Sequence, residues 1–227
     1  MNKLLAIFAS LLLLLAGLSG CGGGGGGSSP STTPTTTQFP IAGAISAYFQ
    51  AGHSFTLSGT SGANTISFQV NYASGTTSIF QGQPASTMTQ TAVISVNGGA
   101  GSTVSGVAYF NASPYQNLGY ISSDGRYQVY ANQQTLPTYA TVGQSGQLDT
   151  YITYTTNTKA VVYATGTETW SLLADTATTA WACNNDTHTV VGSAPAVITN
   201  CFKIDTTGNV LSKTVTMPIN GTVVTFK

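Results

Sequence analysis

Apolar and polar side chains alternate over much of the chain that follows residue 38. Between residues 65 and 72 the apolar positions are Ile66, Phe68, Val70 and Tyr72, with a polar residue between each two. This period of two is typical of a strand with one buried face. Segment 91–96 is similar, with Ala92, Ile94 and Val96 on one face. After the N-terminus no segment sustains a 3.6-residue period, so we expect an all-β, antiparallel, sandwich-like body.

Turn signals separate these expected strands. Asn97-Gly98 follows segment 91–96, Asp124-Gly125 lies between 119–122 and 126–131, and Asn220-Gly221 lies between 215–219 and 223–226. Asn-Gly and Asp-Gly pairs favour tight hairpins because both central residues need positive φ. Residues 207–209 make a further turn. We therefore interpret Asp124 and Asp205, at two of these turns, as turn formers first.

The body also contains a weak internal repeat. Without gaps, segment 48–76 aligns with segment 139–167, and the informative matches are Tyr48 with Tyr139, Leu57 with Leu148, Val70 with Val161 and Tyr72 with Tyr163. A repeat of this length is too long for a solenoid unit. We expect two related copies, residues 39–133 and 134–227. They form either two closed β-domains or two halves of one sheet, which bury the same alternating faces.

The N-terminal segment 1–20 has the pattern of a secretory signal. One cation, Lys3, precedes an apolar run over 4–16 that is too short to span a membrane, and small residues follow. Leu18-Ser19-Gly20-Cys21 resembles the lipobox of bacterial lipoproteins. The resemblance implies cleavage before Cys21 and acylation of that residue, with palmitate as one acyl chain. Gly rather than Asp at position 22 implies the outer membrane. The alternative is an ordinary cleaved signal followed by a free cysteine.

Residues 21–38 are expected to be a tether. Six glycines, 22–27, precede a segment rich in Ser, Thr and Pro, so a flexible part leads into a stiffer, extended part. The tether would hold the folded body away from the bilayer. The partner implied at this end is therefore the membrane, through the lipid on Cys21, with the body on the periplasmic face or at the cell surface.

With Cys21 lipidated, Cys183 and Cys201 remain as an even pair in an oxidising compartment. We expect them to form a disulfide that joins two neighbouring strands at the base of a polar loop, 184–200. A metal-binding pair is the weaker alternative, because the chain has only two histidines.

Composition narrows the classes of partner. Charged residues are 5% of the chain and the net charge is zero, so the sequence offers no basic surface for nucleic acid. No phosphate-binding loop is present, because no Gly-Lys-Ser/Thr follows the glycine run. We expect no cofactor and no resident metal.

Few residues are candidates for acid–base chemistry. Asp149 and Glu168 lie in or beside expected strands and could face solvent, and nothing in their spacing indicates a catalytic pair. His53, at the start of a strand, is expected to be exposed and replaceable. Asp186 and His188 could form a small metal site, but a polar loop is the simpler interpretation. We therefore expect no catalytic residue and predict that the protein is not an enzyme.

The aromatic residues are more numerous, with 11 Tyr, 9 Phe and 2 Trp. Trp170 and Trp181 are interpreted as core residues. Several tyrosines crowd the end of the first copy and form a possible ligand surface for sugars or peptides, although cross-strand packing explains them equally well. These are Tyr115, Tyr120, Tyr127 and Tyr130, with Tyr109 nearby.

Three functional hypotheses follow. The first is a non-enzymatic outer-membrane lipoprotein with a binding, adhesive or structural role and a glycan or envelope protein as its partner. The second is a periplasmic carrier or chaperone whose sheet curls around an apolar ligand. The third, and weakest, is a hydrolase that uses Asp149, Glu168 or the pair Asp186 and His188. Beyond the lipobox and tether, the sequence resembles no characterised family.

Radioactive palmitate supplied to cells that make the protein should label the full-length chain, because Cys21 is expected to be acylated. Labelling is read by autoradiography of the purified protein. A wild-type protein that takes up no palmitate would refute the lipobox assignment.

Overall fold

A single antiparallel sheet dominates the computed structural model, which describes residues 37–112, 115–219 and 221–227. The strand order is β15-β14-β13-β12-β11-β10-β8-β7-β6-β5-β3-β2, with β4 paired to β5. Strands from both expected copies therefore join one continuous sheet. Its strands are β2 (His53–Ser61), β3 (Asn64–Ser74), β4 (Ser78–Phe80), β5 (Gln83–Val96), β6 (Ser102–Ala112), β7 (Tyr115–Ser122), β8 (Tyr127–Ala131), β10 (Ser145–Tyr154), β11 (Val162–Ala174), β12 (Thr179–Val190), β13 (Ala196–Asp205), β14 (Val210–Ile219) and β15 (Thr222–Phe226).

The sheet curls until its first and last strands meet. The backbone N–H of Ser58 in β2 donates to the carbonyl of Lys227 at 3.0 Å, and the N–H of Lys227 donates back to Ser58 at 3.1 Å. Gly59 allows this approach, since a Cβ there would lie 2.8 Å from Val224 Cγ1. The result is a nearly closed, barrel-like sheet, which removes most of the exposed edge that an open sheet would carry.

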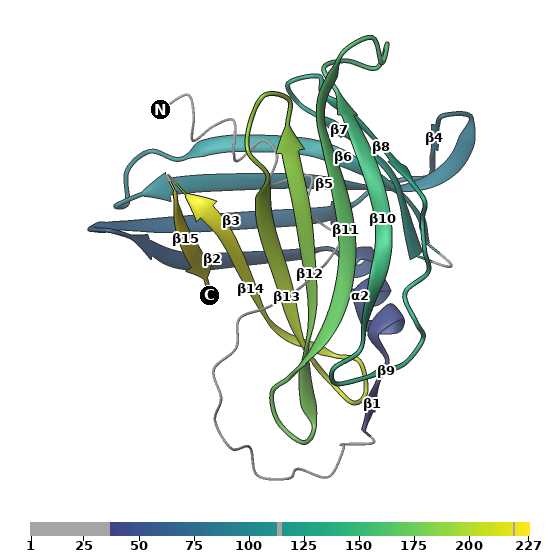
Figure 1. Ribbon diagram of the computed structural model, residues 1–227, viewed down its shortest axis with the longest axis vertical. Coiled ribbons are helices and arrows are strands. Elements are labelled where there is room, and N and C mark those ends of the chain that lie inside the picture. The colour runs from purple at the N-terminus through teal and green to yellow at the C-terminus, as the bar shows by residue number, and fades with distance from the viewer. Residues whose placement is uncertain (1–36, 113–114, 220) are drawn as a thin grey trace.

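This closure corrects the expected sandwich. The all-β, antiparallel class is confirmed, but the two facing layers belong to one sheet whose ends pair with each other. In Figure 1 strands β2, β3, β5 and β6 run across the view, while β10–β13 run up and down in front of them. The core lies between these two halves, where Phe68 of β3 packs near Phe226 of β15.

One helix, α2 (Ile41–Ala51), covers part of the interior. Ile41, Ala44, Tyr48 and Phe49 are its buried residues, at the spacing of one helical face. The ring of Phe49 packs edge-on against Tyr72 of β3 and Phe202 of β13, so the helix contacts both halves of the sheet. This helix was not expected from the sequence. A short pair, β1 (Gln38–Phe39) with β9 (Ala140–Thr141), fixes the chain just before it.

The expected hairpins are present. Asp124-Gly125 joins β7 to β8, residues 206–209 join β13 to β14, and the connection between β14 and β15 contains Gly221 at φ 80°. Asn97 and Gly98 both have positive φ, 51° and 71°, as a tight turn between β5 and β6 requires. In β3 all four expected apolar positions are buried, whereas Val96 at the end of β5 is exposed.

The disulfide between Cys183 and Cys201 is present. The two residues are directly opposite each other in the register of β12 and β13. The expected long loop is wrong, however, because residues 184–190 continue β12 and residues 196–200 already belong to β13. The disulfide therefore joins two strands within the sheet, and only a short turn connects them.

Segment 1–36, which holds the expected signal, Cys21 and nearly all of the tether, lies outside the described residues. Among the residues that are described, none belongs to a helix of the length and apolarity needed to cross a membrane.

Phe226→Ala should destabilise the fold strongly because this fully buried ring lies in the strand that closes the sheet. We expect a loss of about 3–5 kcal/mol in the free energy of unfolding, measured by urea denaturation. Val223→Ala in the same strand is the control, since Val223 is 71% exposed and should change stability by less than about 0.5 kcal/mol. Equal effects of the two substitutions would contradict the closure by β15.

Candidate functional site

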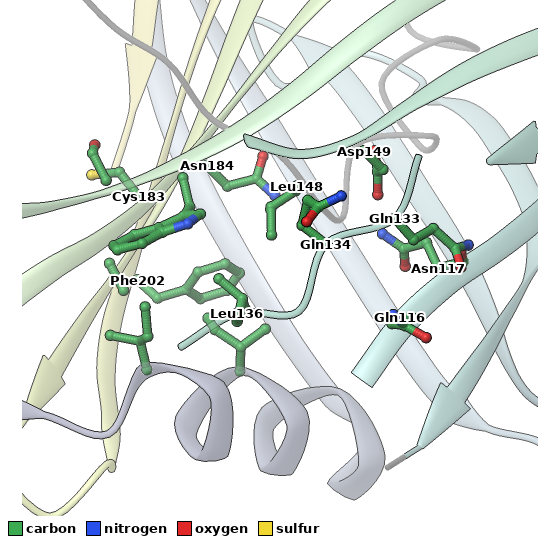
Figure 2. A pocket seen from close by; sticks show the side chains of 15 residues that line it. Gln116, Asn117, Gln133, Gln134, Leu136, Leu148, Asp149, Cys183, Asn184 and Phe202 are labelled. Carbon is green, nitrogen blue, oxygen red and sulfur yellow. The ribbon is translucent and has the colours of Figure 1, made fainter. Parts of the chain in front are cut away.

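A pocket lies between helix α2 and the inner face of the sheet (Figure 2). Its volume is about 50 Å³, which is room for a few water molecules or a narrow organic group. Strands β10–β13 form one wall, the start of β7 forms another, and the segment after β8 crosses over it. The side chains that line it are Ile41, Ile45, Gln116, Asn117, Gln133, Gln134, Leu136, Leu148, Asp149, Trp170, Ser171, Ala182, Cys183, Asn184 and Phe202.

Local hydrogen bonds hold the crossing segment in place. The side-chain amide of Gln133 donates to the carbonyl of Asn117, and the backbone N–H of Gln134 donates to the carbonyl of Leu148. Leu136 then packs against the main core. These contacts tie the segment to β7 and to β10, so the pocket is bounded by fixed backbone on that side.

The lining is apolar at one end and polar at the other. In Figure 2 Phe202 and Leu136 lie above helix α2, with Asn184 above Phe202, and Asp149, Gln133 and Asn117 lie to the right. Asn184, which is 8% exposed, has an amide oxygen without a hydrogen-bond partner. The carboxyl group of Asp149, by contrast, is hydrogen-bonded to the side chains of Glu168 and Asn117. Buried polar atoms normally have partners, so the amide oxygen of Asn184 is the exception in this lining.

Asp149 is the first of three buried acids on neighbouring strands. Asp149 of β10 is opposite Glu168 of β11, and Glu168 is opposite Asp186 of β12. Their exposed fractions are 4%, 0% and 1%. The expectation that Asp149 and Glu168 could face solvent is therefore wrong, because both belong to the inner face of the sheet.

Burial is the main cause of the raised pKa values in this cluster, since it penalises the charged form of each acid. It raises the pKa of Asp149 to about 8 and the pKa of Asp186 to about 7. The pKa of Glu168 is raised well above its usual value, first by burial and then by the negative charges of Asp149 and Asp186. At neutral pH Asp149 and Glu168 therefore stay mostly protonated and Asp186 about half protonated, whereas all three would be ionised in water.

Tyr151 connects Asp186 to His188. Its hydroxyl lies 2.7 Å from Asp186 Oδ2, to which it donates, and 2.8 Å from His188 Nδ1. With the phenol proton directed to Asp186, the histidine donates from Nδ1 and leaves Nε2 without a partner. Gly166 makes room for the phenol, because a Cβ there would lie 2.1 Å from Tyr151 Cζ. Burial, followed by the charge of Arg126, lowers the pKa of His188 to about 4.

A buried lysine lies elsewhere in the interior. Lys213 Nζ is 4.5 Å from the ring centre of Phe55, 4.7 Å from that of Phe202 and 5.5 Å from that of Tyr72. These rings stabilise an ammonium by cation–π attraction. Burial nevertheless lowers the pKa of Lys213 to about 7, so the group is close to losing its charge at neutral pH.

Over the described part of the chain, no three His, Cys, Asp or Glu side chains come together in a way that could hold a metal ion. Asp186 and His188 do lie close together, as the sequence suggested, but Tyr151 occupies the position between them. Their arrangement is a hydrogen-bonded chain through a phenol.

The four tyrosines of the possible ligand surface do not share one surface. Tyr120 is buried, and burial raises its pKa strongly. Tyr127 stacks on Phe80 of the β4 hairpin, and Tyr130 packs edge-on against Tyr151 in the interior. Tyr115 lies at the start of β7. Sheet packing, the alternative interpretation, accounts for Tyr120, Tyr127 and Tyr130.

Other expected residues have clear positions. Trp170 is partly buried against the core and lines the pocket. Trp181 differs from expectation, because it is only half-buried and its indole donates to Asp175 at 3.2 Å.

His53 begins β2 and stacks on Tyr48 with ring centres 4.1 Å apart. Asp124 and Asp205 are turn formers as expected, with Asp205 accepting from the backbone N–H groups of Thr207 and Asn209.

No protein-family model matches this chain, and neither does any curated protein or solved structure. The assignment of a function therefore depends on the pocket and on the acids beside it.

The buried acids predict an unusual dependence of stability on pH. Each has a higher pKa in the folded chain than in the unfolded chain, so folding takes up protons above about pH 4. The free energy of unfolding should therefore fall as pH rises from about 5 to 6.5, as measured by urea denaturation at each pH. The contribution of His188 to the free energy of unfolding rises with pH in this range, because its pKa is lowered on folding. It offsets the contribution of only one of the three acids.

Glu168→Gln tests the source of this dependence. The variant removes one titrating group from a buried site of nearly the same shape. The free energy of unfolding should therefore fall less steeply with pH, by about 1.4 kcal/mol per pH unit, which corresponds to one proton. Lys213 does not interfere, because its shift acts above about pH 7. A wild-type stability that is flat or that rises over this range would contradict protonated acids in the interior.

Proposed function

We propose that this protein is an outer-membrane lipoprotein, anchored through Cys21, whose barrel-like sheet binds a small ligand in the pocket under helix α2. The observation that carries the proposal is the pocket itself. It has an apolar end, a polar end, and a buried amide oxygen, that of Asn184, without a hydrogen-bond partner. Small-molecule sites commonly combine an apolar lining with a few such polar groups.

The shape of the fold supports a binding role. Helix α2 and the segment after β8 cover the pocket, and hydrogen bonds to Asn117 and Leu148 hold that segment in place. A site that is formed before the ligand arrives loses little entropy on binding. The lipobox and the tether would keep such a binding protein in the envelope, within reach of ligands in the periplasm or at the cell surface.

Hydrolysis has weaker support. Glycoside hydrolysis uses two carboxyl groups that flank the scissile bond. Asp149 lines the pocket, but Glu168 and Asp186 do not. A substrate in the pocket would meet one carboxyl group. The hydrogen-bonded chain of Asp186, Tyr151 and His188 is likewise absent from the lining. An adhesive surface built on the four tyrosines also has less support, because at least two of them are buried.

Ala182→Leu should block the pocket, because Ala182 lines it and a leucine side chain would fill most of the space. Wild-type protein extracted gently from membranes should show, in native mass spectrometry, a small mass increment that is lost on denaturation. The variant should lack it. Overpacking costs about 1–3 kcal/mol, so the variant should remain folded, as circular dichroism will check.

Ala47→Leu is the matched control, since it makes the same change at an exposed position on helix α2. It should keep the increment. Wild-type protein found only as the bare lipidated monomer would contradict the binding proposal, and so would an increment that Ala182→Leu leaves unchanged.

A further inference from the structure

We propose that a second hollow, beneath the β4 hairpin, binds a single neutral sugar ring. This site is additional to the pocket under helix α2 and takes a different class of ligand. The hollow has a volume of about 200 Å³, against about 50 Å³ for the pocket. The two spaces meet at Gln133, whose side chain lines both.

An aromatic stack fixes the hairpin over the hollow. The ring centre of Phe80 lies 4.7 Å from that of Tyr109 in β6 and 5.3 Å from that of Tyr127 in β8. Gly119 of β7 makes room, because a Cβ there would overlap the Phe80 ring. In Figure 1 the hairpin stands at the right-hand edge of the view, next to β8. The walls of the hollow are therefore in place before a ligand arrives, which limits the entropy lost on binding.

Amide groups supply the polar part of the lining. Gln81 and Gln83 lie on either side of Gly82 at the tip of the hairpin and are exposed, so the hollow is open to solvent. Gln133 faces it from the segment after β8. An amide donates hydrogen bonds through its nitrogen and accepts them through its oxygen. A sugar hydroxyl also does both, so a ring with several hydroxyl groups can pair with all three amides.

The absence of charge in the lining selects against ions. Among the described residues that line the hollow, none is Asp, Glu, Lys, Arg or His. A phosphate, carboxylate or ammonium would lose hydration there without meeting an opposite charge. A wholly apolar ligand is disfavoured for the opposite reason, because it would remove water from three amides and return no hydrogen bond.

The rest of the lining suits the carbon skeleton of a sugar. Leu118, Val129 and Phe80 are apolar, and Tyr130 is partly buried beside them. These side chains can cover the C–H groups of a ring while its hydroxyl groups reach the amides. A volume of about 200 Å³ corresponds to roughly six or seven water molecules of the liquid. One pyranose ring with its hydroxyl groups occupies a space of this order.

The backbone of the hairpin tip also indicates a binding role. Gln81 has φ 50° and Gly82 has φ 81°, as in the two-residue turn that favours Asn-Gly. Glutamine at positive φ is uncommon, and such conformations cluster at binding sites. A hydrogen bond joins the side chains of Gln81 and Tyr127, which holds this longer amide at the hollow.

Nuclear magnetic resonance of the ¹⁵N-labelled full-length protein tests the site, in a detergent without a sugar head group. D-Glucose, D-galactose, D-mannose and N-acetylglucosamine are titrated separately. At least one should bind with a dissociation constant in the millimolar range, as expected for a small neutral ligand. The same sugar should shift the side-chain amide signals of Gln81, Gln83 and Gln133. Its charged analogues, glucosamine and glucuronate in the case of glucose, should bind more weakly.

Gln83→Leu should weaken binding of that sugar by about threefold or more, because it removes one amide and keeps a side chain of similar size. The position is exposed, so the variant should fold. Gln69→Leu is the matched control, since it makes the same change at an exposed position of β3 and should leave the affinity unchanged.

Three results would each overturn the proposal. One is that none of the four neutral sugars binds. Another is that a charged analogue binds more tightly than its neutral parent. The third is that the sugar binds Gln83→Leu as tightly as the wild-type protein, or shifts only signals from residues away from the hollow.

Discussion

Three carboxyl groups can lie together inside this sheet only while they keep most of their protons. Ionised carboxylates at such short range, without a cation among them, would each carry a large desolvation cost. Protonation removes that cost and adds O–H donors to the interior. The packing of β10, β11 and β12 therefore requires acids that stay largely protonated. The raised pKa values of Asp149, Glu168 and Asp186 meet this requirement. Of the three acids, Asp149 reaches the pocket and contributes to its polar lining.

The strands were predictable because their signal is local. Alternation in β3, and the turn residues at 97–98, 124–125 and 207–209, follow from backbone geometry within a few residues. The closure of the sheet was not, since it depends on β2 and β15, which are far apart in the chain. Alternation looks the same in a sandwich and in a curled sheet. The sequence relation between residues 39–133 and 134–227 stays a prediction, and both segments contribute strands to the same sheet.

Two features were missed although the sequence contained a signal for them. Helix α2 has apolar residues at 41, 44, 45, 48 and 49 and Gly52 after its last residue, which is a short amphipathic helix with a C-terminal glycine. The buried acids follow the strand period, with Asp149 and Tyr151 on one face of β10, and Asp186 and His188 on one face of β12. Polar residues usually lie on the solvent face of a sheet, so the sequence alone indicated that these acids were exposed. Which face was buried depended on the tertiary fold.

The meeting of β2 with the C-terminus has a consequence for biogenesis. Residue 227 has to be synthesised before Ser58 gains its last backbone partner, so the sheet cannot close while the chain is still being made. Until then β2 presents an open edge, which is a template for pairing with other chains. Contacts between such distant segments also form slowly. A chain built in this way is open to such pairing until its last strand is in place, and a truncated copy would stay open for its whole lifetime.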